Sequence, residues 1–195
     1  MVATLVNTAL TMVGVFAVVP NISTFLQNNL GYPREKLDLL YFVGGFATVL
    51  ATRGIGVLVD RVGATRVITL GTLVFATALW FGFVRPVTAE HVIWVFPLLM
   101  LSASLRGVPL NTLATRVPAL PERARFMSAQ SSVQHLASTA GAVAASAVLA
   151  DGAGGRLENM ELVALAAIAI ALLVPVVSSF VERGVRRKEA ARAAA

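Results

Sequence analysis

Apolar segments long enough to cross a lipid bilayer recur along the whole chain, and this recurrence restricts the fold more than any other feature. Of the 195 residues, 57% are hydrophobic and 13% are charged, whereas a soluble domain of this length needs a far more polar surface. A helix of about 20 apolar residues spans the hydrocarbon core of a membrane. We therefore predict an integral membrane protein of the all-α class.

Six apolar segments can be delimited, and each is predicted to form a transmembrane helix. Pro20, next to Asn21, should kink the first of them, because proline lacks the N–H that a helix interior requires. In the fifth, Ala137, Gly141 and Ala145 recur every four residues, which is typical of a face that packs closely on another helix. The predicted bundle covers residues 1–182 and a basic cytoplasmic tail covers 183–195, with approximate helices at 2–26, 37–59, 67–84, 91–113, 126–149 and 160–181.

Basic residues divide unevenly between the two sides of this bundle. One side holds the turn after the second helix, the loop after the fourth and the tail, and it carries ten arginines and lysines. The other side carries four, at Arg34, Lys36, Arg85 and Arg156. Since cytoplasmic loops are enriched in these residues, we predict that the first side and both termini are cytoplasmic. This bias accounts for the net charge of +6 without nucleic-acid binding, for which the chain has no motif.

No enzyme class finds support in the sequence. The chain has no cysteine and only two histidines, His91 and His135, without metal-ligand spacing. Phosphate-binding loops and nucleophile motifs are also missing. We expect no enzymatic activity, no metal site and no cofactor, and an ATP-driven pump is disfavoured.

The turn between the second and third helices reads Gly56-Val57-Leu58-Val59-Asp60-Arg61-Val62-Gly63-Ala64-Thr65-Arg66. Asp60 stands at a helix C-terminus, where the helix dipole disfavours an anion. Its charge must therefore be compensated by Arg61, by Arg66 or by the N-terminus of a neighbouring helix. Gly56 would let a facing helix come close, and Gly63 would permit a tight turn. A simple solvated turn with a surface ion pair is the alternative interpretation.

This pattern, G-x-L-x-D-R-x-G, resembles the signature loop of the major facilitator superfamily, which joins the second and third helices of each six-helix half on the cytoplasmic side. The loop Pro121-Glu122-Arg123-Ala124-Arg125 and the element Leu105-Arg106-Gly107 also resemble that family. The family usually has basic residues directly after the second glycine, whereas this chain has Ala64 and Thr65 before Arg66. Among family members the chain looks most like the C-terminal half of a bacterial sugar-efflux or drug-efflux permease.

The resemblance implies half of a twelve-helix fold in the bacterial inner membrane. It also implies that five residues of the turn form a conformational latch, namely Gly56, Asp60, Arg61, Gly63 and Arg66. The helix that such a loop contacts would belong to a second six-helix half.

A short internal repeat points in the same direction. Val19-Pro20-Asn21 has a counterpart in Val108-Pro109-Leu110-Asn111, and the same shift carries the start of the second helix, near Leu37, onto the start of the fifth, near Phe126. We predict two inverted three-helix repeats, as in other transporters. Chance similarity of two short segments is the alternative.

Arg106 should lie about 15 Å inside the fourth helix, close to the midplane, where an arginine must face protein or water. No acid of the chain lies at that depth, so its counter-charge would be a carbonyl, an acid of another half or an anionic substrate. His135 lies at similar depth with Gln134 and Gln130 nearby, and Asn111 lies about one turn below Arg106. The alternatives are a structural arginine satisfied by carbonyls and a hydrogen-bonded packing histidine.

Candidate substrate or proton-pathway residues are therefore Arg106, Asn111, Gln134 and His135, together with three further polar residues of the helices, Asn7, Asn21 and Arg53. Arg53 would join the Asp60 network or line a cytoplasmic vestibule. For the two asparagines, hydrogen bonding in the core is an equal alternative.

The sequence thus predicts a transporter that moves a small solute by alternating access, as a proton-coupled exporter of a drug-like or sugar-like substrate. Its expected partners are the lipid bilayer, the substrate, protons, and a second six-helix half, either an N-terminal half or a second copy of the chain. The alternative is a non-transporting six-helix membrane scaffold or an inactive truncated half-transporter.

Overall fold

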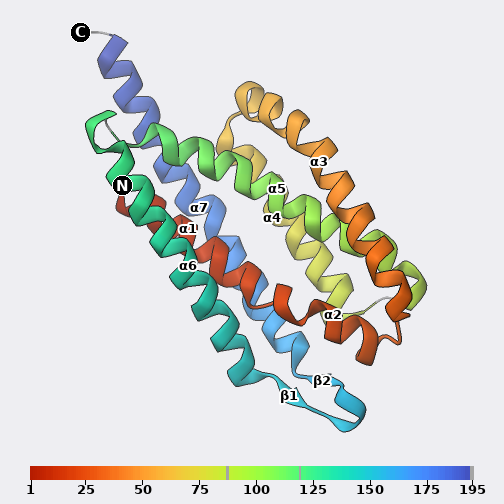
Figure 1. Cartoon of the computed structure of the whole chain (residues 1–195). Helices are drawn as coiled ribbons and strands as arrows, with labels where there is room; N and C mark the ends of the chain where they lie inside the picture. The colour runs from red at the N-terminus through yellow and green to blue at the C-terminus, as the bar shows by residue number, and fades with distance from the viewer. Residues whose placement is uncertain (87, 119, 194–195) are drawn as a thin grey trace.

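The computed structural model describes residues 1–86, 88–118 and 120–193, and this part of the chain is almost entirely helical (Figure 1). The prediction of an all-α chain is confirmed for these residues, apart from one short hairpin of strands. The long helices are α1 (Val2–Phe16), α3 (Leu37–Val62), α4 (Ala64–Leu79), α5 (Val92–Arg116), α6 (Arg123–Val148) and α7 (Met160–Ala193).

Five segments of the described chain are long and apolar enough to cross a membrane. They are Val2–Asn29, Arg34–Val62, Ala64–Val84, Ala89–Arg116 and Met160–Arg187. The helix α6 has the length but is less apolar, because glutamine, histidine and many serines interrupt its apolar residues. By length and hydropathy the structure therefore supports five membrane spans, and α6 is too polar to be counted among them.

The first apolar segment is interrupted next to Pro20. The helix α1 ends at Phe16, a 3₁₀ turn covers Val19–Asn21, and the short helix α2 (Ile22–Thr24) continues into a π-helical turn over Phe25–Asn29. Proline removes one backbone donor, and the N–H of Asn21 turns instead to the carbonyl of Val18 at 3.0 Å. The Asn21 side chain donates to the Ala17 carbonyl at 3.4 Å. It thereby replaces the backbone donor that this carbonyl loses at the helix break.

Several helix boundaries differ from the sequence-based ranges; for example, α3 ends at Val62 rather than near residue 59. The helix α4 begins at Ala64, directly after the turn, rather than near residue 67. The helix α7 does not stop near residue 181 but continues to Ala193, so the predicted basic tail is a helical extension of the last apolar segment. Alanine, arginine and lysine, which make up most of that tail, are strong helix formers.

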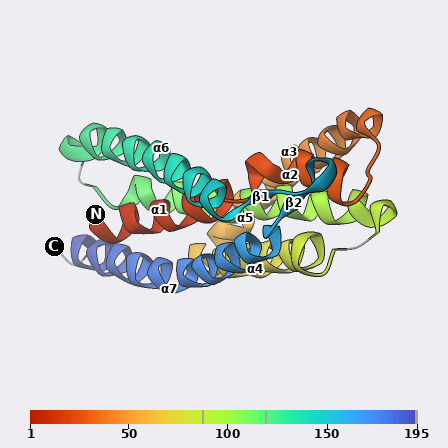
Figure 2. The same ribbon diagram turned by 90° about the horizontal axis from the view of Figure 1, so that it is seen from below.

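The long helices pack side by side in an order that differs from their order in sequence. The helix α6 packs on α1, α1 packs on α7, α7 on α4, α4 on α5, and α5 on α3. Figure 2 shows the result from below: α4 and α7 lie along one side of the bundle, while α3 and α6 stand at the opposite edges of the other side. Each outer helix therefore has one main neighbour and leaves most of its circumference uncovered.

Small residues hold α6 against α1. Ala137, Gly141 and Ala145 are buried on one face of α6, as their spacing predicts. A Cβ added at Gly141 would lie 2.5 Å from the carbonyl oxygen of Val13, so the two backbones touch at this point. Only glycine permits that approach, and helix pairs in membranes use small residues in the same way.

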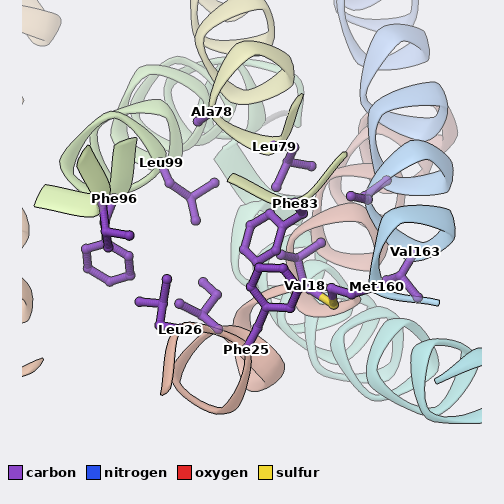
Figure 3. Packing of buried hydrophobic residues seen from close by; sticks show 14 of the residues in the cluster. Val18, Phe25, Leu26, Ala78, Leu79, Phe83, Phe96, Leu99, Met160 and Val163 are labelled. Carbon is purple, nitrogen blue, oxygen red and sulfur yellow. The ribbon is translucent and has the colours of Figure 1, made fainter. Parts of the chain in front are cut away.

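Apolar side chains from all six apolar segments form the main core at the end of the bundle away from the α3–α4 turn (Figure 3). The two π-helical turns meet there: the rings of Phe25 and Phe83 lie 5.0 Å apart between centroids. Val18, Leu79 and Met160 are almost fully buried beside them. The aromatic contact fixes the segment after Pro20 against the end of α4.

A hairpin between α6 and α7 forms hydrogen bonds with the turn Phe25–Asn29. Its strands are β1 (Ala150–Asp151) and β2 (Leu157–Glu158), paired antiparallel. Asn29 donates to the Leu157 carbonyl at 2.8 Å and accepts from the Leu157 N–H at 2.9 Å, so its amide pairs with that peptide group as a neighbouring strand would. Asn28 donates to the Gly155 carbonyl at 2.7 Å. The C-terminal end of the first apolar segment is thereby hydrogen-bonded to the connection between α6 and α7.

We predict that Gly141→Ala destabilises the protein by about 1–3 kcal/mol, because the added methyl group must push α1 and α6 apart. The matched control is Gly45→Ala in α3, where a Cβ would have no neighbour within 4 Å. That change should be neutral or stabilise by up to about 1 kcal/mol. Thermal unfolding in detergent, followed by circular dichroism, measures both; equal midpoints for the two variants would contradict the close contact.

Candidate functional site

The turn between α3 and α4 consists of one residue, Gly63. Its backbone has φ 91° and ψ 153°, a conformation that residues with a side chain rarely adopt. A Cβ at this position would also lie 2.9 Å from Oε1 of Glu182 and 3.1 Å from a terminal nitrogen of Arg186. Gly63 is therefore needed twice, for the backbone conformation and for the space that the α7 side chains occupy.

Glu182 on α7 binds the N-terminus of α4. Its Oε2 accepts the backbone N–H of Thr65 at 2.8 Å, and its Oε1 accepts from Arg186 at 2.7 Å. The first N–H groups of a helix lack partners within the helix and carry partial positive charge, so a carboxylate stabilises them. The Glu182 side chain is 14% exposed, which keeps this interaction partly out of water.

Sequence reasoning did not single out Glu182. The available signal was an acid four residues before an arginine, at the end of the last apolar segment and directly before the basic tail. Its backbone partner on α4 lies 117 residues away in the sequence, so no local pattern indicates it.

Asp60 has a different partner from those expected. An oxygen of its carboxylate lies 4.0 Å from a terminal nitrogen of Arg116 at the end of α5, and both side chains are well exposed. Neither Arg61 nor Arg66 forms an ion pair with it among the described residues. The pair joins α3 to α5, and exposed pairs of this kind are weak enough to break and re-form.

These side chains surround one cavity of about 910 Å³ between the α3–α4 turn and the ends of α5 and α7. Four of the five predicted latch residues line it, namely Asp60, Arg61, Gly63 and Arg66. Gly56 does not, and a Cβ there would meet nothing within 4 Å. The expected close approach at Gly56 is thus not made by any described part of this chain.

Arg106 is the largest fully buried side chain of the described chain, at 1% exposure. Its guanidinium carbon lies 3.8 Å above the ring of Phe75, and its Nε donates to the Ser102 carbonyl at 3.4 Å. Gly71 on α4 makes room, since a Cβ there would lie 2.9 Å from Cγ of Arg106. Both terminal nitrogens lack a hydrogen-bond partner, so the carbonyl expected as a counter-charge satisfies only part of the group.

The other midplane candidates do not surround Arg106. Asn111, Gln134 and His135 are exposed on the surface of this chain, and α6 packs on α1 rather than on α5. Gln130, by contrast, is buried, and its side-chain oxygen has no partner. The structure thus separates one buried arginine from a set of polar side chains that face outward.

The three remaining candidates also lie apart from one another. Asn7 is buried on α1 and donates to Ser178 of α7 at 2.8 Å, while its side-chain oxygen has no partner. Asn21 is bonded to the Ala17 carbonyl, as described above. Arg53 is exposed on α3 and forms no described ion pair with Asp60.

The sequence matches the family model of the Major Facilitator Superfamily over residues 4–195, nearly the whole chain. No curated protein matches the sequence at a significant level.

We predict that Glu182→Ala destabilises the protein by about 1.5–3 kcal/mol, because it removes charge-assisted hydrogen bonds to Thr65 and Arg186. Glu90→Ala is the matched control, since Glu90 is exposed and forms no described ion pair. It should change stability by less than about 0.5 kcal/mol. Denaturant or thermal unfolding in detergent compares them, and a loss of the same size in both would show that the Glu182 contact is not formed.

Proposed function

The chain belongs to the major facilitator superfamily of membrane transporters, and from this premise we propose that it moves a small solute by alternating access, as a proton-coupled exporter of drug-like or sugar-like molecules. The observation that carries the proposal is the charged network around the α3–α4 turn. Two small sets of contacts lie at this end of the bundle. The ion pair of Asp60 with Arg116 joins α3 to α5, and Glu182, paired with Arg186, joins α7 to Thr65 of α4.

This network has the properties of a reversible latch. An exposed ion pair contributes about 0–1 kcal/mol, so the Asp60–Arg116 contact biases one conformation without fixing it. The contact of Glu182 with α4 is more buried and keeps α4 and α7 together as one unit. Opening and closing would then separate α3 and α5 at their ends while the α4–α7 pair stays intact.

Exposed polar side chains on α6 support a second six-helix half as partner. Gln134 and His135 are exposed, and the exposed hydroxyl residues Ser131 and Thr139 lie on the same side of the helix as His135, four residues before and after it. Polar groups within a membrane face protein or a water-filled cavity rather than lipid. In our proposal α6 is the sixth membrane span, and this polar side faces the solute pathway and the other half.

The packing of the helices supports the inverted repeat. When α1, α3 and α4 are exchanged with α5, α6 and α7, the contact of α6 with α1 becomes that of α3 with α5. The contact of α7 with α1 becomes that of α4 with α5, and the α4–α7 contact maps onto itself. An inverted repeat of three helices produces this symmetry.

Two groups are proposed for coupling and for substrate binding. The ring of His135 has no hydrogen-bond partner among the described residues, and histidine changes charge close to neutral pH. The terminal nitrogens of Arg106 lack acceptors, so this group is available to an acid of the second half or to an anionic solute. We place both termini in the cytoplasm on the distribution of arginine and lysine, and we place the protein in a bacterial inner membrane because its sequence resembles bacterial efflux permeases.

We predict that Asp60→Asn slows flux in proteoliposomes by up to about fivefold, the effect of an ion pair worth at most about 1 kcal/mol. The chain is assayed alone and with an N-terminal six-helix half, against drugs, sugars and organic anions. Asp151→Asn, an exposed acid of the β1–β2 hairpin, should leave flux and membrane insertion unchanged. Unaltered flux in Asp60→Asn would remove the latch from the proposal, and no flux of any compound in either preparation would contradict transport itself.

A separate prediction concerns proton coupling. His135→Gln removes the imidazole but keeps a polar side chain, so flux driven by an imposed pH gradient should fall to the level measured without a gradient. His91→Gln is the control, because His91 lies outside the long helices. Retained gradient-driven flux in His135→Gln would assign coupling to another group.

A further inference from the structure

The cavity at the α3–α4 turn carries an excess of positive charge. Side chains from all four of its helices contribute, and the charged ones are Arg61, Arg66, Arg116, Arg183, Arg186, Asp60 and Glu182. The five arginines face only two carboxylates. Figure 1 shows the turn between α3 and α4 at the same end of the bundle as the last turns of α5 and α7.

The two carboxylates are already engaged. Asp60 lies beside Arg116, and Glu182 is bonded to Arg186 and to the backbone of α4. The remaining three arginines, Arg61, Arg66 and Arg183, are exposed and form no described hydrogen bond or ion pair. Three like charges around one cavity repel each other unless an anion neutralises them.

The depth of the cavity points to the source of that anion. The candidate membrane spans end or begin at its walls, at Val62, Ala64, Arg116 and Arg187. Its lining also includes the apolar side chains of Val59, Leu113 and Val185. The cavity therefore lies where the hydrocarbon of a bilayer gives way to headgroups, and basic pockets between helices at that depth bind anionic lipid headgroups.

We propose that this cavity is a binding site for the phosphate-bearing headgroup of an anionic membrane lipid. Arg61, Arg66 and Arg183 supply the charge for the phosphate oxygens, and the apolar wall accepts the adjoining part of the lipid. A headgroup in this position lies next to both Asp60 and Glu182, so the lipid acts on the contacts that hold the turn. The site does not depend on transport, and its test needs no substrate.

Native mass spectrometry of the full chain in detergent tests the site with dioleoyl phosphatidylglycerol and dioleoyl phosphatidylcholine as probes. The native protein should retain phosphatidylglycerol at a concentration about tenfold or more below that needed for phosphatidylcholine, since each basic group near the surface contributes about 1 kcal/mol. The triple variant Arg61→Gln, Arg66→Gln, Arg183→Gln should lose this preference. The matched control Arg34→Gln, Lys36→Gln, Arg85→Gln removes three exposed basic residues at the opposite ends of α3 and α4 and should keep it.

Each other outcome overturns a named part of the proposal. Equal retention in the triple variant and the native protein would exclude the cavity as the site. Displacement of the lipid by millimolar inorganic phosphate would assign the cavity to a free anion. Loss of the lipid when a second six-helix half is bound would assign the cavity to an acidic segment of that half.

Circular dichroism and gel filtration show whether the triple variant folds. If it does not, the proposal is tested by comparing lipid retention in the native protein and in Arg183→Gln. Retention of phosphatidylglycerol by the native protein should fall steeply between 0.05 and 0.5 M NaCl, because salt screens a charge interaction, and Arg183→Gln should weaken it at every salt concentration. Retention that does not depend on salt, or is unchanged by Arg183→Gln, would contradict the proposal.

Discussion

The absence of a side chain at Gly63 is the constraint on which the structure around the α3–α4 turn depends. Because Gly63 adopts a positive φ, α3 and α4 are joined by a single residue. Because it has no Cβ, the carboxylate of Glu182 can reach the first turn of α4. The contact of α7 with the first turn of α4 and one wall of the charged cavity depend on this turn. The second glycine of this turn thus has a physical reason that involves a helix far away in the sequence.

Much of the architecture could be predicted because it depends on local chemistry. Apolar length located the helices, Pro20 located the break in the first segment, and the spacing of Ala137 and Gly141 located the contact with another helix. The contacts of Glu182 could not be predicted, since they join residues whose only relation is spatial. Arg106 was recognised as unusual, but its packing on Phe75 depends on the glycine opposite it in α4.

The polar groups within the helices fall into two physical classes. Asn7 and Arg106 are buried inside this bundle and are incompletely bonded there, so they carry a desolvation cost within the chain itself. Gln134, His135 and Asn111 are exposed, and their environment is set by whatever covers α6 and α5. The environment of the first class is set by the interior of this bundle and that of the second by what lies outside it.

The composition of α6 has a consequence for how the protein is made. A helix rich in serine and glutamine, with a histidine, gains little free energy on leaving the translocon for lipid, because each polar residue offsets the gain from apolar neighbours. Its contact with α1 through Gly141 supplies interactions that lipid cannot provide. In our proposal, in which α6 crosses the membrane, its integration is therefore coupled to tertiary folding: α1 acts as an intramolecular receptor for α6, a helix more than one hundred residues later in the sequence.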